Sequence, residues 1–414
     1  MLNWVFNAFN KQQYKRALFR YKCFRILQHN YFGKRDVFLR KPIRERDYLQ
    51  QIEGTYTKLH DAVALEIVGP DFTAAKRKKR QFTYPELYYG VLKNVTFTAI
   101  TNYITAPEKY VINQDFFAEN IDRLNHKSES EYIPFKDKNC MIVDAAKQEV
   151  QTFKGAITIC LPFTNNYYHW LIEVIPKFQF INNLPSEFDD YPLLVNGRVK
   201  KVPQLLDVLK IYQTKQREVV YLDAGTNVKA DNLVVIDALS WILLDLRHGE
   251  KNLLTDSVIH PLAISFLRSI LPINNKYSKW GEKVYLSRKN QALRKFNEQE
   301  VIDVLEQRGF DVIFPEQLSF LEQVALFNAA KFIVGATGAA LTNLVYCKPN
   351  TKAICLISTN WNLGYFSNIA HQVGVDLKYI VSNYDKDEGA NIRIGEKFVV
   401  NIPSLINVVD KWEN

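Results

Sequence analysis

Alternation of β and α patterns between residues 283 and 357 constrains the fold more than any other feature of this 414-residue chain. Short runs rich in β-forming residues, such as 331–334, alternate with runs whose apolar residues recur at helical spacing, such as 298–307. Ser319 and Glu322 form a capping-box pattern at the start of one predicted helix. Strands that alternate with helices in this way predict an α/β fold.

Two glycines, Gly335 and Gly338, follow the predicted strand at 331–334 and precede a further predicted helix. Glycine allows the backbone angles that a sharp strand-to-helix turn needs, and its missing side chain lets a ligand approach the amides. The start of a helix carries partial positive charge and unbonded N–H groups, which suit a phosphate or a carboxylate. The segment therefore predicts an anion site, although a tight turn without a ligand explains the glycines equally well. It lacks the third glycine of the Rossmann dinucleotide fingerprint.

A second segment, residues 165–178, combines polar and apolar positions on one predicted helix. His169 and Glu173 are four residues apart, so they share a face of that helix. Trp170 and Val174 form a neighbouring apolar stripe. A histidine and a glutamate together can perform acid–base chemistry when their site is partly buried. An ordinary surface pair, or a histidine bonded inside the core, remains the alternative interpretation.

The net charge of +9 favours anionic partners such as nucleotides, phospholipid head groups or anionic glycans. The five cysteines are scattered without a C-x-x-C pair, which predicts a reduced protein without a zinc site. No signal-peptide pattern and no apolar run of the roughly 18 to 20 residues that cross a membrane are found. These features predict a cytoplasmic protein. Nucleic acid is not an expected partner, because no nucleic-acid-reading module is visible.

Composition and pattern divide the chain into four predicted parts. Residues 1–50 are basic and aromatic and predict an amphipathic helical segment, which either lies on an anionic membrane surface or docks on the domain behind it. Residues 51–272 predict a first α/β domain with a small β portion, and residues 273–390 predict a second α/β domain. Residues 391–414 predict a helix that crosses back to the first domain. The basic run at 76–80 predicts a solvated loop, with attraction to a membrane or an anionic acceptor as the alternative.

The two segments together resemble glycosyltransferase family 61 over about residues 155–360. The mid-chain part of the resemblance is the pattern Tyr168-His169-Trp170-Leu171-x-Glu173-x-x-Pro176. The C-terminal part consists, in order, of Tyr285-Leu286-Ser287-Arg288, Arg294, Asn297, Glu298, Gly309-Phe310, Gly335-x-x-Gly338-Ala339-x-Leu341-Thr342-Asn343 and Pro349. One position departs from the pattern, since the family usually has a histidine where this chain has Thr337.

The resemblance implies a GT-B fold, in which two Rossmann-like domains face each other across a cleft. It implies an inverting, metal-independent glycosyltransferase that moves a sugar from a nucleotide sugar, usually a UDP-sugar, to a glycan or lipid-linked glycan acceptor. Bacterial relatives act in capsule and lipopolysaccharide biosynthesis, which fits a cytoplasmic protein that is either free or peripheral on the inner membrane. No cofactor beyond the nucleotide sugar is expected. The D-x-D pattern of Asp385-Lys386-Asp387 is interpreted as a chance match.

The resemblance also implies roles for individual residues. Glu173 is the expected base for the acceptor hydroxyl, and His169 is either a second candidate or the residue that orients Glu173. Arg288 and Arg294 are expected to neutralise the departing diphosphate, with surface salt bridges as the alternative. The other expected donor-side residues are Gly335, Thr337, Gly338, Ala339 and Leu341 at the diphosphate, Glu316 at the nucleoside, and Asn343, which contacts either the ligand or the loop backbone.

Thr337 motivates a second hypothesis from another functional class. A decayed donor site would leave a non-catalytic glycan-binding or assembly subunit of a polysaccharide machinery. Such a protein would bind the acceptor without transferring a sugar to it.

Overall fold

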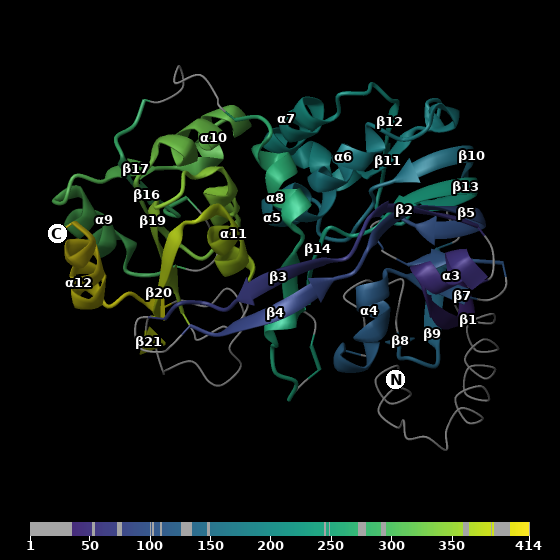
Figure 1. The fold of residues 1–414 in the computed structure, drawn as a ribbon, viewed down its shortest axis with the longest axis horizontal. Helices are drawn as coiled ribbons and strands as arrows, with labels where there is room; N and C mark the ends of the chain where they lie inside the picture. Colours follow the sequence, from purple (N-terminus) through teal and green to yellow (C-terminus); the bar gives the residue numbers. More distant parts are fainter. Residues whose placement is uncertain are drawn as a thin grey trace.

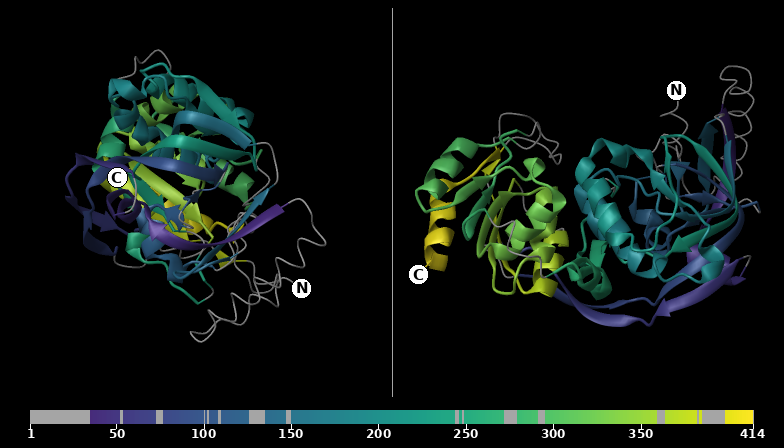
Figure 2. Two further views of the ribbon diagram at one scale, coloured as in Figure 1. Left: turned by 90° about the vertical axis from the view of Figure 1, so that its right-hand side faces the viewer. Right: turned by 90° about the horizontal axis from the view of Figure 1, so that it is seen from above.

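Two β-sheets, each with its own helices, form two lobes that lie side by side (Figures 1 and 2). The structure is a computed structural model. It describes residues 35–51, 54–72, 77–99, 101, 103–107, 110–125, 135–146, 150–243, 246–247, 249–271, 279–290, 295–358, 364–381, 383–384 and 398–413. Most of the predicted N-terminal helical segment, residues 1–34, lies outside these ranges.

The first lobe is built on a mixed sheet of 11 strands, in the order β12-β11-β10-β13-β5-β6-β7-β1-β9-β8, with β2 paired to β5. The strands are β1 (Arg35–Arg44), β2 (Thr55–His60), β5 (Leu87–Thr98), β6 (Ile104–Thr105), β7 (Tyr110–Asn113), β8 (Phe135–Lys136), β9 (Met141–Ala146), β10 (Val150–Thr158), β11 (Leu193–Asn196), β12 (Val219–Leu222) and β13 (Asn227–Ile236). Strands β12, β11, β10 and β13 are parallel, and β5 runs antiparallel to β13.

Helices cover both faces of this sheet. One face carries the helical segment that starts at α5 (Tyr167–His169) and continues through the π-helical turn η3 (Trp170–Val174), η4 (Ile175–Lys177) and α6 (Phe178–Ile181), together with α7 (Pro203–Tyr212) and α8 (Pro261–Arg268). The other face carries α3 (Glu45–Gln51), whose Tyr48 and Leu49 pack against it, and α4 (Asp115–Glu119) lies beside β1.

The second lobe is a five-stranded parallel sheet in the order β17-β16-β18-β19-β20. Its strands are β16 (Lys283–Leu286), β17 (Asp311–Ile313), β18 (Phe332–Ala336), β19 (Lys352–Ile357) and β20 (Asp376–Val381). Its helices are α9 (Glu298–Glu306), η9 (Pro315–Gln317), α10 (Phe320–Ala329), the 3₁₀ helix η10 (Ala339–Tyr346), α11 (Tyr365–Val373) and α12 (Ile402–Glu413). The predicted mixed α/β fold with parallel strands agrees with this arrangement.

Two segments differ from the sequence-based expectation. Residues 35–44, the end of the predicted N-terminal helical segment, form strand β1, because they pair with β7 on one side and β9 on the other. Helix α12 stays on the second lobe instead of crossing back: Trp412 lies edge-on to Phe332 at 5.3 Å, and Arg308 bonds Asp410 at 2.9 Å. Its apolar stripe is thereby buried against α9.

A β-hairpin, β3 (Val63–Val68) and β4 (Lys79–Tyr84), reaches from the first lobe to the second (Figure 1). Val68 N donates to Asn368 Oδ1 at 2.8 Å, and Lys378 bonds Asp71 at 2.7 Å. Part of the predicted basic loop at 76–80 belongs to this hairpin, because Lys79 lies in β4 and forms a salt bridge with Glu66 at 3.0 Å. The hairpin therefore fastens the two lobes to each other.

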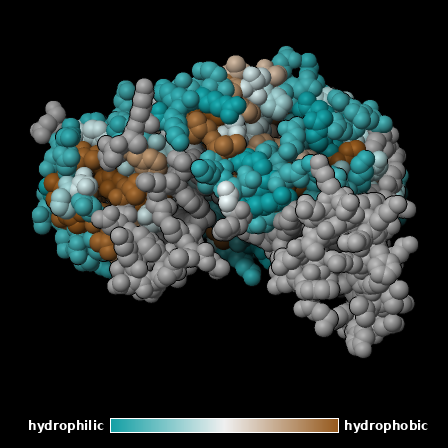
Figure 3. All heavy atoms as spheres, turned by 90° about the horizontal axis from the view of Figure 1, so that it is seen from below, coloured by the Kyte–Doolittle hydropathy of each residue, from teal (hydrophilic) through white to brown (hydrophobic). Residues whose placement is uncertain are grey.

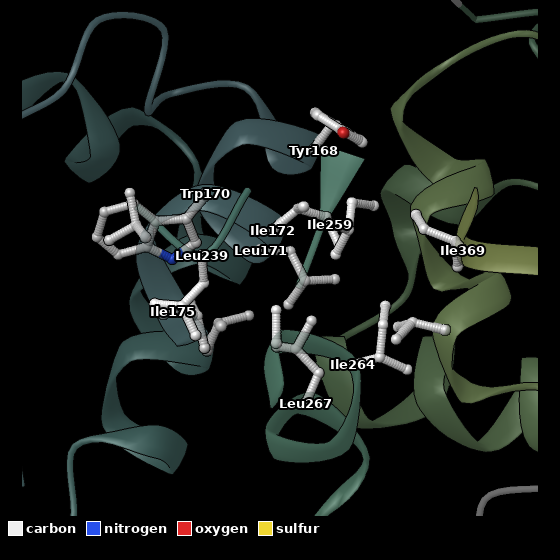
Figure 4. Packing of buried hydrophobic residues seen from close by; sticks show 14 of the residues in the cluster. Tyr168, Trp170, Leu171, Ile172, Ile175, Leu239, Ile259, Ile264, Leu267 and Ile369 are labelled. Atoms are coloured by element: carbon white, nitrogen blue, oxygen red, sulfur yellow. The ribbon is translucent and has the colours of Figure 1, made fainter. Parts of the chain in front are cut away.

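A continuous hydrophobic core runs through the contact between the lobes. Figure 4 shows Leu171 and Ile172 on the side of α8, with Ile369 of α11 facing them from the second lobe, while Trp170 extends to the opposite side. Trp170 is fully buried and its Nε1 donates to Leu205 O at 2.9 Å. Truncating a tryptophan in such a place costs about 3 to 5 kcal/mol. The core therefore fixes the helical segment that carries His169.

The visible underside of the molecule is mostly hydrophilic, with separate hydrophobic patches (Figure 3). Within the ranges that the structure describes, no helix is both long enough and apolar enough to cross a bilayer.

Candidate active site

The helical segment that carries the predicted acid–base pair starts just after the end of β10. Asn166 caps it, because Asn166 Oδ1 accepts from Tyr168 N at 2.9 Å. The segment then widens to a π-helical turn and tightens to a 3₁₀ turn at Pro176, which has no N–H to donate. Irregular turns of this kind are frequent at functional sites. The predicted helix is confirmed.

His169 and Glu173 lie together on one face of this segment. His169 Nδ1 is 3.0 Å from Glu173 Oε1, and the two side chains are 12% and 16% exposed. The pair is thus largely buried but reaches the surface, unlike an ordinary exposed salt bridge. This is the environment in which a carboxylate and an imidazole can exchange protons with a bound ligand.

Lys177 continues the same face one turn further. Its side chain is buried, and Nζ donates to Ile236 O at 2.7 Å. Burial lowers the pKa of Lys177, while the carboxylates of Glu45, Asp237 and Glu173 oppose that shift. A pocket beside Lys177 is lined also by Glu45, Gln114, Thr158 and Leu161, at the carboxyl ends of β10 and β13. The face of His169 and Glu173 therefore continues toward a small hollow of the first lobe that has both polar and apolar walls.

In the second lobe, the structure brings Arg288 and Gly338 together. Leu286 and Gly335 are register partners on the adjacent parallel strands β16 and β18, so the loops that follow both strands leave the same edge of the sheet. A Cβ on Gly338 would lie 2.3 Å from Arg288 Nη1. The guanidinium therefore lies against the Gly338 backbone, and a side chain at this position would have to displace it.

The backbone angles correct the sequence-based reason for these glycines. Gly338 has φ 172°, which is extended backbone open to any residue, and Gly335 is not among the positive-φ glycines. A Cβ on Gly335 would meet Leu286 Cβ at 3.2 Å. Close packing, rather than a left-handed turn, explains both positions.

Glu298, which the sequence analysis named only as part of a pattern, holds the loop of Arg288 in place. Its Oε1 accepts from Arg288 N at 2.6 Å, from Ser287 Oγ at 2.9 Å and from Tyr285 OH at 3.0 Å. Three donors on one carboxylate oxygen fix the end of β16. The sequence contained one indication of this role, because Glu298 is part of the pattern that resembles the family.

Two amides of the predicted diphosphate cradle are already bonded within the protein. Thr337 N donates to Leu356 O at 2.8 Å, and Leu341 N donates to Gly338 O at 3.1 Å. The Leu341 side chain is fully buried, and Ala339 is half-buried at the start of η10. These two amides are therefore not open donors for a diphosphate.

The three remaining residues that were predicted on the donor side are Glu316, Asn343 and Arg294. Glu316 Oε1 accepts from Asn290 Nδ2 at 3.3 Å, and its backbone oxygen accepts from Gln204 Nε2 at 3.1 Å. Asn343 is fully buried and bonds side chains on both sides, which favours the structural interpretation of that residue. Arg294 lies outside the described residues, as does the D-x-D pattern at 385–387.

Asn343 links the two halves of the site. Its Oδ1 accepts from Tyr167 OH at 2.7 Å, and its Nδ2 donates to Gln323 Oε1 at 2.8 Å. Tyr167 begins α5, which carries His169, and Asn343 lies in η10, which begins just after Gly338. The helical segment that carries the acid–base pair and the helix that follows the turn at Gly335–Gly338 therefore contact each other.

Among the residues that the structure describes, no three His, Cys, Asp or Glu side chains lie close enough together to hold a metal ion. Metal independence stays a prediction.

Comparison with known proteins gives one family. Residues 167–354 match the family model Glycosyltransferase 61. The matched stretch begins at Tyr167 and ends inside β19, so it contains the His169–Glu173 pair, Arg288 and Gly338. No curated protein matches the chain. The family match supports the resemblance seen in the motifs, and with it a glycosyltransferase activity.

Proposed function

We propose that this protein is an inverting glycosyltransferase that moves a sugar from a nucleotide sugar, UDP-linked, to a glycan acceptor. The family match over residues 167–354 supports transferase activity. The observation that carries the proposal is the Tyr167–Asn343 hydrogen bond of 2.7 Å. It joins the helix of the acid–base pair to η10, which begins just after Gly338, the residue against which the Arg288 guanidinium lies.

The first lobe supplies the base. Inversion is a single displacement, in which the acceptor oxygen forms a bond to the anomeric carbon while the bond to the diphosphate breaks. Glu173 takes the proton of the acceptor hydroxyl as that oxygen attacks. His169, 3.0 Å away, orients the carboxylate and is the second candidate for the base.

The second lobe stabilises the leaving group. The departing diphosphate carries the electron pair of the broken bond, so its negative charge grows in the transition state. Arg288 presents a guanidinium that remains charged at physiological pH and bonds phosphate oxygens in pairs. Its loop is held by Glu298, which makes the cation a fixed donor that needs little reorganisation during the reaction.

The finer parts of the proposal follow from the resemblance. The two lobes correspond to a GT-B arrangement, and the transfer needs no metal and no cofactor besides the nucleotide sugar. Capsule or lipopolysaccharide biosynthesis is the proposed pathway, with a lipid-linked or free glycan as acceptor. The proposed location is the cytoplasm, either free or at the inner surface of the membrane.

A non-catalytic glycan-binding subunit is the second candidate. Thr337 stands where the family usually has histidine, and its amide is bonded to Leu356 O at 2.8 Å. A protein whose donor site has decayed in this way would still bind the acceptor but would release no diphosphate.

Nucleotide-induced stabilisation tests the proposal. Thermal unfolding is followed with UDP, GDP, CDP and ADP at concentrations well above micromolar. A ligand present at 100 times its Kd stabilises the folded state by about 2.7 kcal/mol, and we expect UDP to raise the Tm of the wild type. The shift should disappear in Arg288→Gln. Absence of stabilisation by every diphosphate would contradict the donor site and favour the binding subunit.

A further inference from the structure

Phe163 stands out in the loop that joins β10 to α5. It is 48% exposed, although phenylalanine is a residue that folded proteins usually bury. Its backbone has φ 62°, in the left-handed region that non-glycine residues rarely occupy. Both features cost stability. A single exposed apolar residue needs no explanation by itself, but an exposed aromatic residue on a strained backbone does.

The rest of the loop holds Phe163 in this conformation. Thr164 is fully buried, and its Oγ1 donates to Leu161 O at 3.2 Å. Asn166 N donates to Phe163 O at 2.8 Å, which closes a turn just before the helix. Strain of this kind persists where the surroundings determine the backbone fully, and such positions gather at ligand sites.

The Phe163 ring borders the acid–base pair. Its centroid is 5.7 Å from the centroid of the His169 ring, and the two planes are tilted by 37°. His169 in turn is 3.0 Å from Glu173. An exposed aromatic ring therefore borders the pair that contains the proposed base, on the lobe that carries Glu173.

We propose that Phe163 is a stacking platform for the acceptor: a pyranose ring packs its apolar C–H face on the phenyl ring and directs a hydroxyl toward Glu173. This inference rests on the proposed function and extends it to the acceptor side. A large, rigid aromatic surface binds an apolar ring face at low entropic cost and leaves the equatorial hydroxyls to polar partners. The strained, exposed ring is thus explained by a ligand that covers it.

Saturation-transfer NMR tests this with defined probes. The probes are the methyl β-glycosides of glucose, galactose, N-acetylglucosamine and xylose at millimolar concentration. The variants are Phe163→Ala, Phe163→Gly and Phe163→Tyr, with Phe72→Leu, a partly buried site in the hairpin arm, as the control. UDP-induced stabilisation is measured on the same samples as an independent reading of the donor side.

We expect at least one glycoside to bind the wild type with the strongest saturation on the C–H protons of one ring face. Its Kd should rise about tenfold in Phe163→Ala and stay within about twofold in Phe163→Tyr. Phe163→Gly should lose binding while its Tm stays equal or rises, because glycine relieves the left-handed backbone. UDP stabilisation should be the same in all variants.

Three results would overturn the inference: unchanged glycoside binding in Phe163→Ala, no saturation of any probe by the wild type, or a fall in Tm for Phe163→Gly, which would indicate a structural role. A wild type that binds glycosides through Phe163 but is not stabilised by UDP would leave this inference intact and contradict the donor site instead.

Discussion

The hydroxyl of Tyr167 donates to Asn343 Oδ1 at 2.7 Å, across the boundary between the two lobes. Burial raises the pKa of Tyr167, so the hydroxyl keeps its proton and remains a donor at any physiological pH. On the other side, Asn343 bonds Gln323 at 2.8 Å, so both polar groups of its side chain are used. The bond therefore ties the acid–base helix to η10, which begins just after the Gly338 backbone that the Arg288 guanidinium lies against.

Removing either partner of this bond should destabilise the protein. Tyr167→Phe loses one hydrogen bond and should cost about 1 kcal/mol. Asn343→Ala removes the acceptor of Tyr167 OH and the donor to Gln323 Oε1, and should cost about 2 to 3 kcal/mol. Urea unfolding of both single variants and the double variant gives their coupling energy, which we expect to be about 1 kcal/mol. Strict additivity of the two single effects would show that the bond does not form.

Gly338→Ala should weaken nucleotide binding without unfolding the protein. The new Cβ would lie 2.3 Å from Arg288 Nη1 and must displace the guanidinium, whereas φ 172° suits alanine. A hydrogen bond to a charged group contributes about 1.5 to 3 kcal/mol, so UDP affinity, measured by calorimetry, should fall about 10- to 100-fold.

Gly309→Ala is the matched control. Gly309 has φ +76°, and no atom lies within 4 Å of the position that a Cβ would take, so alanine brings backbone strain alone. This variant should lose about 1 kcal/mol of stability and bind UDP as the wild type does. Equal UDP affinity of Gly338→Ala and wild type would mean that Arg288 does not contact the nucleotide.

Glu45 should make stability depend on pH. Burial, and after it the charge of Asp115, raises the pKa of Glu45 from 4.5 to about 7. The carboxyl is thus favoured in its protonated form on folding, so its contribution is complete below about pH 4.5 and is lost as the pH rises through about 7. At about 1.4 kcal/mol per unit, this amounts to about 3 kcal/mol.

Glu45→Gln should remove the part of the pH dependence of the unfolding free energy that Glu45 causes. In urea unfolding, the stability of Glu45→Gln relative to the wild type should therefore increase between pH 5 and pH 8. Asp115 and Asp237 have raised pKa values as well, mainly through burial, so some slope should remain. The exposed Glu187→Gln serves as control and should follow the wild type. Parallel curves for Glu45→Gln and wild type would show that Glu45 is ionised in the fold.

The second lobe could be predicted element by element, because its signals are local. The capping box is present as expected: Glu322 N donates to Ser319 Oγ at 3.3 Å, and Ser319 N donates to Glu322 Oε2 at 3.0 Å. Strands β16 and β19 are each followed by a helix with an apolar face, α9 and α11, and parallel pairing of such units needs few long-range choices.

The first lobe could be predicted only in part, because its pairing is decided by contacts distant in sequence. Strand β13 lies between β10 and β5, and β1 is a strand because β7 and β9 flank it. The hairpin arm is stabilised by α11 of the other lobe, for example through Asn368 and Val68. No local pattern encodes such partners.

Within the site, residue types were predicted better than their bonds. The spacing of His169 and Glu173 placed them on one face correctly, and their 3.0 Å contact follows from it. By contrast, the hydrogen bond from Leu341 N to Gly338 O forms because η10 is a 3₁₀ helix, and no sequence pattern distinguished this helix from an α-helix. The left-handed backbone of Phe163 likewise depends on the buried Thr164 beside it.

The central claim is that Glu173 activates the acceptor hydroxyl. The most direct measurement is the release of UDP from a set of UDP-sugars in the presence of glycan acceptors, for wild type and Glu173→Gln, with Glu187→Gln as control. We expect Glu173→Gln to lower the transfer rate by about 10² to 10⁴-fold while UDP still stabilises the protein as in the wild type. Transfer at the wild-type rate by Glu173→Gln would contradict it.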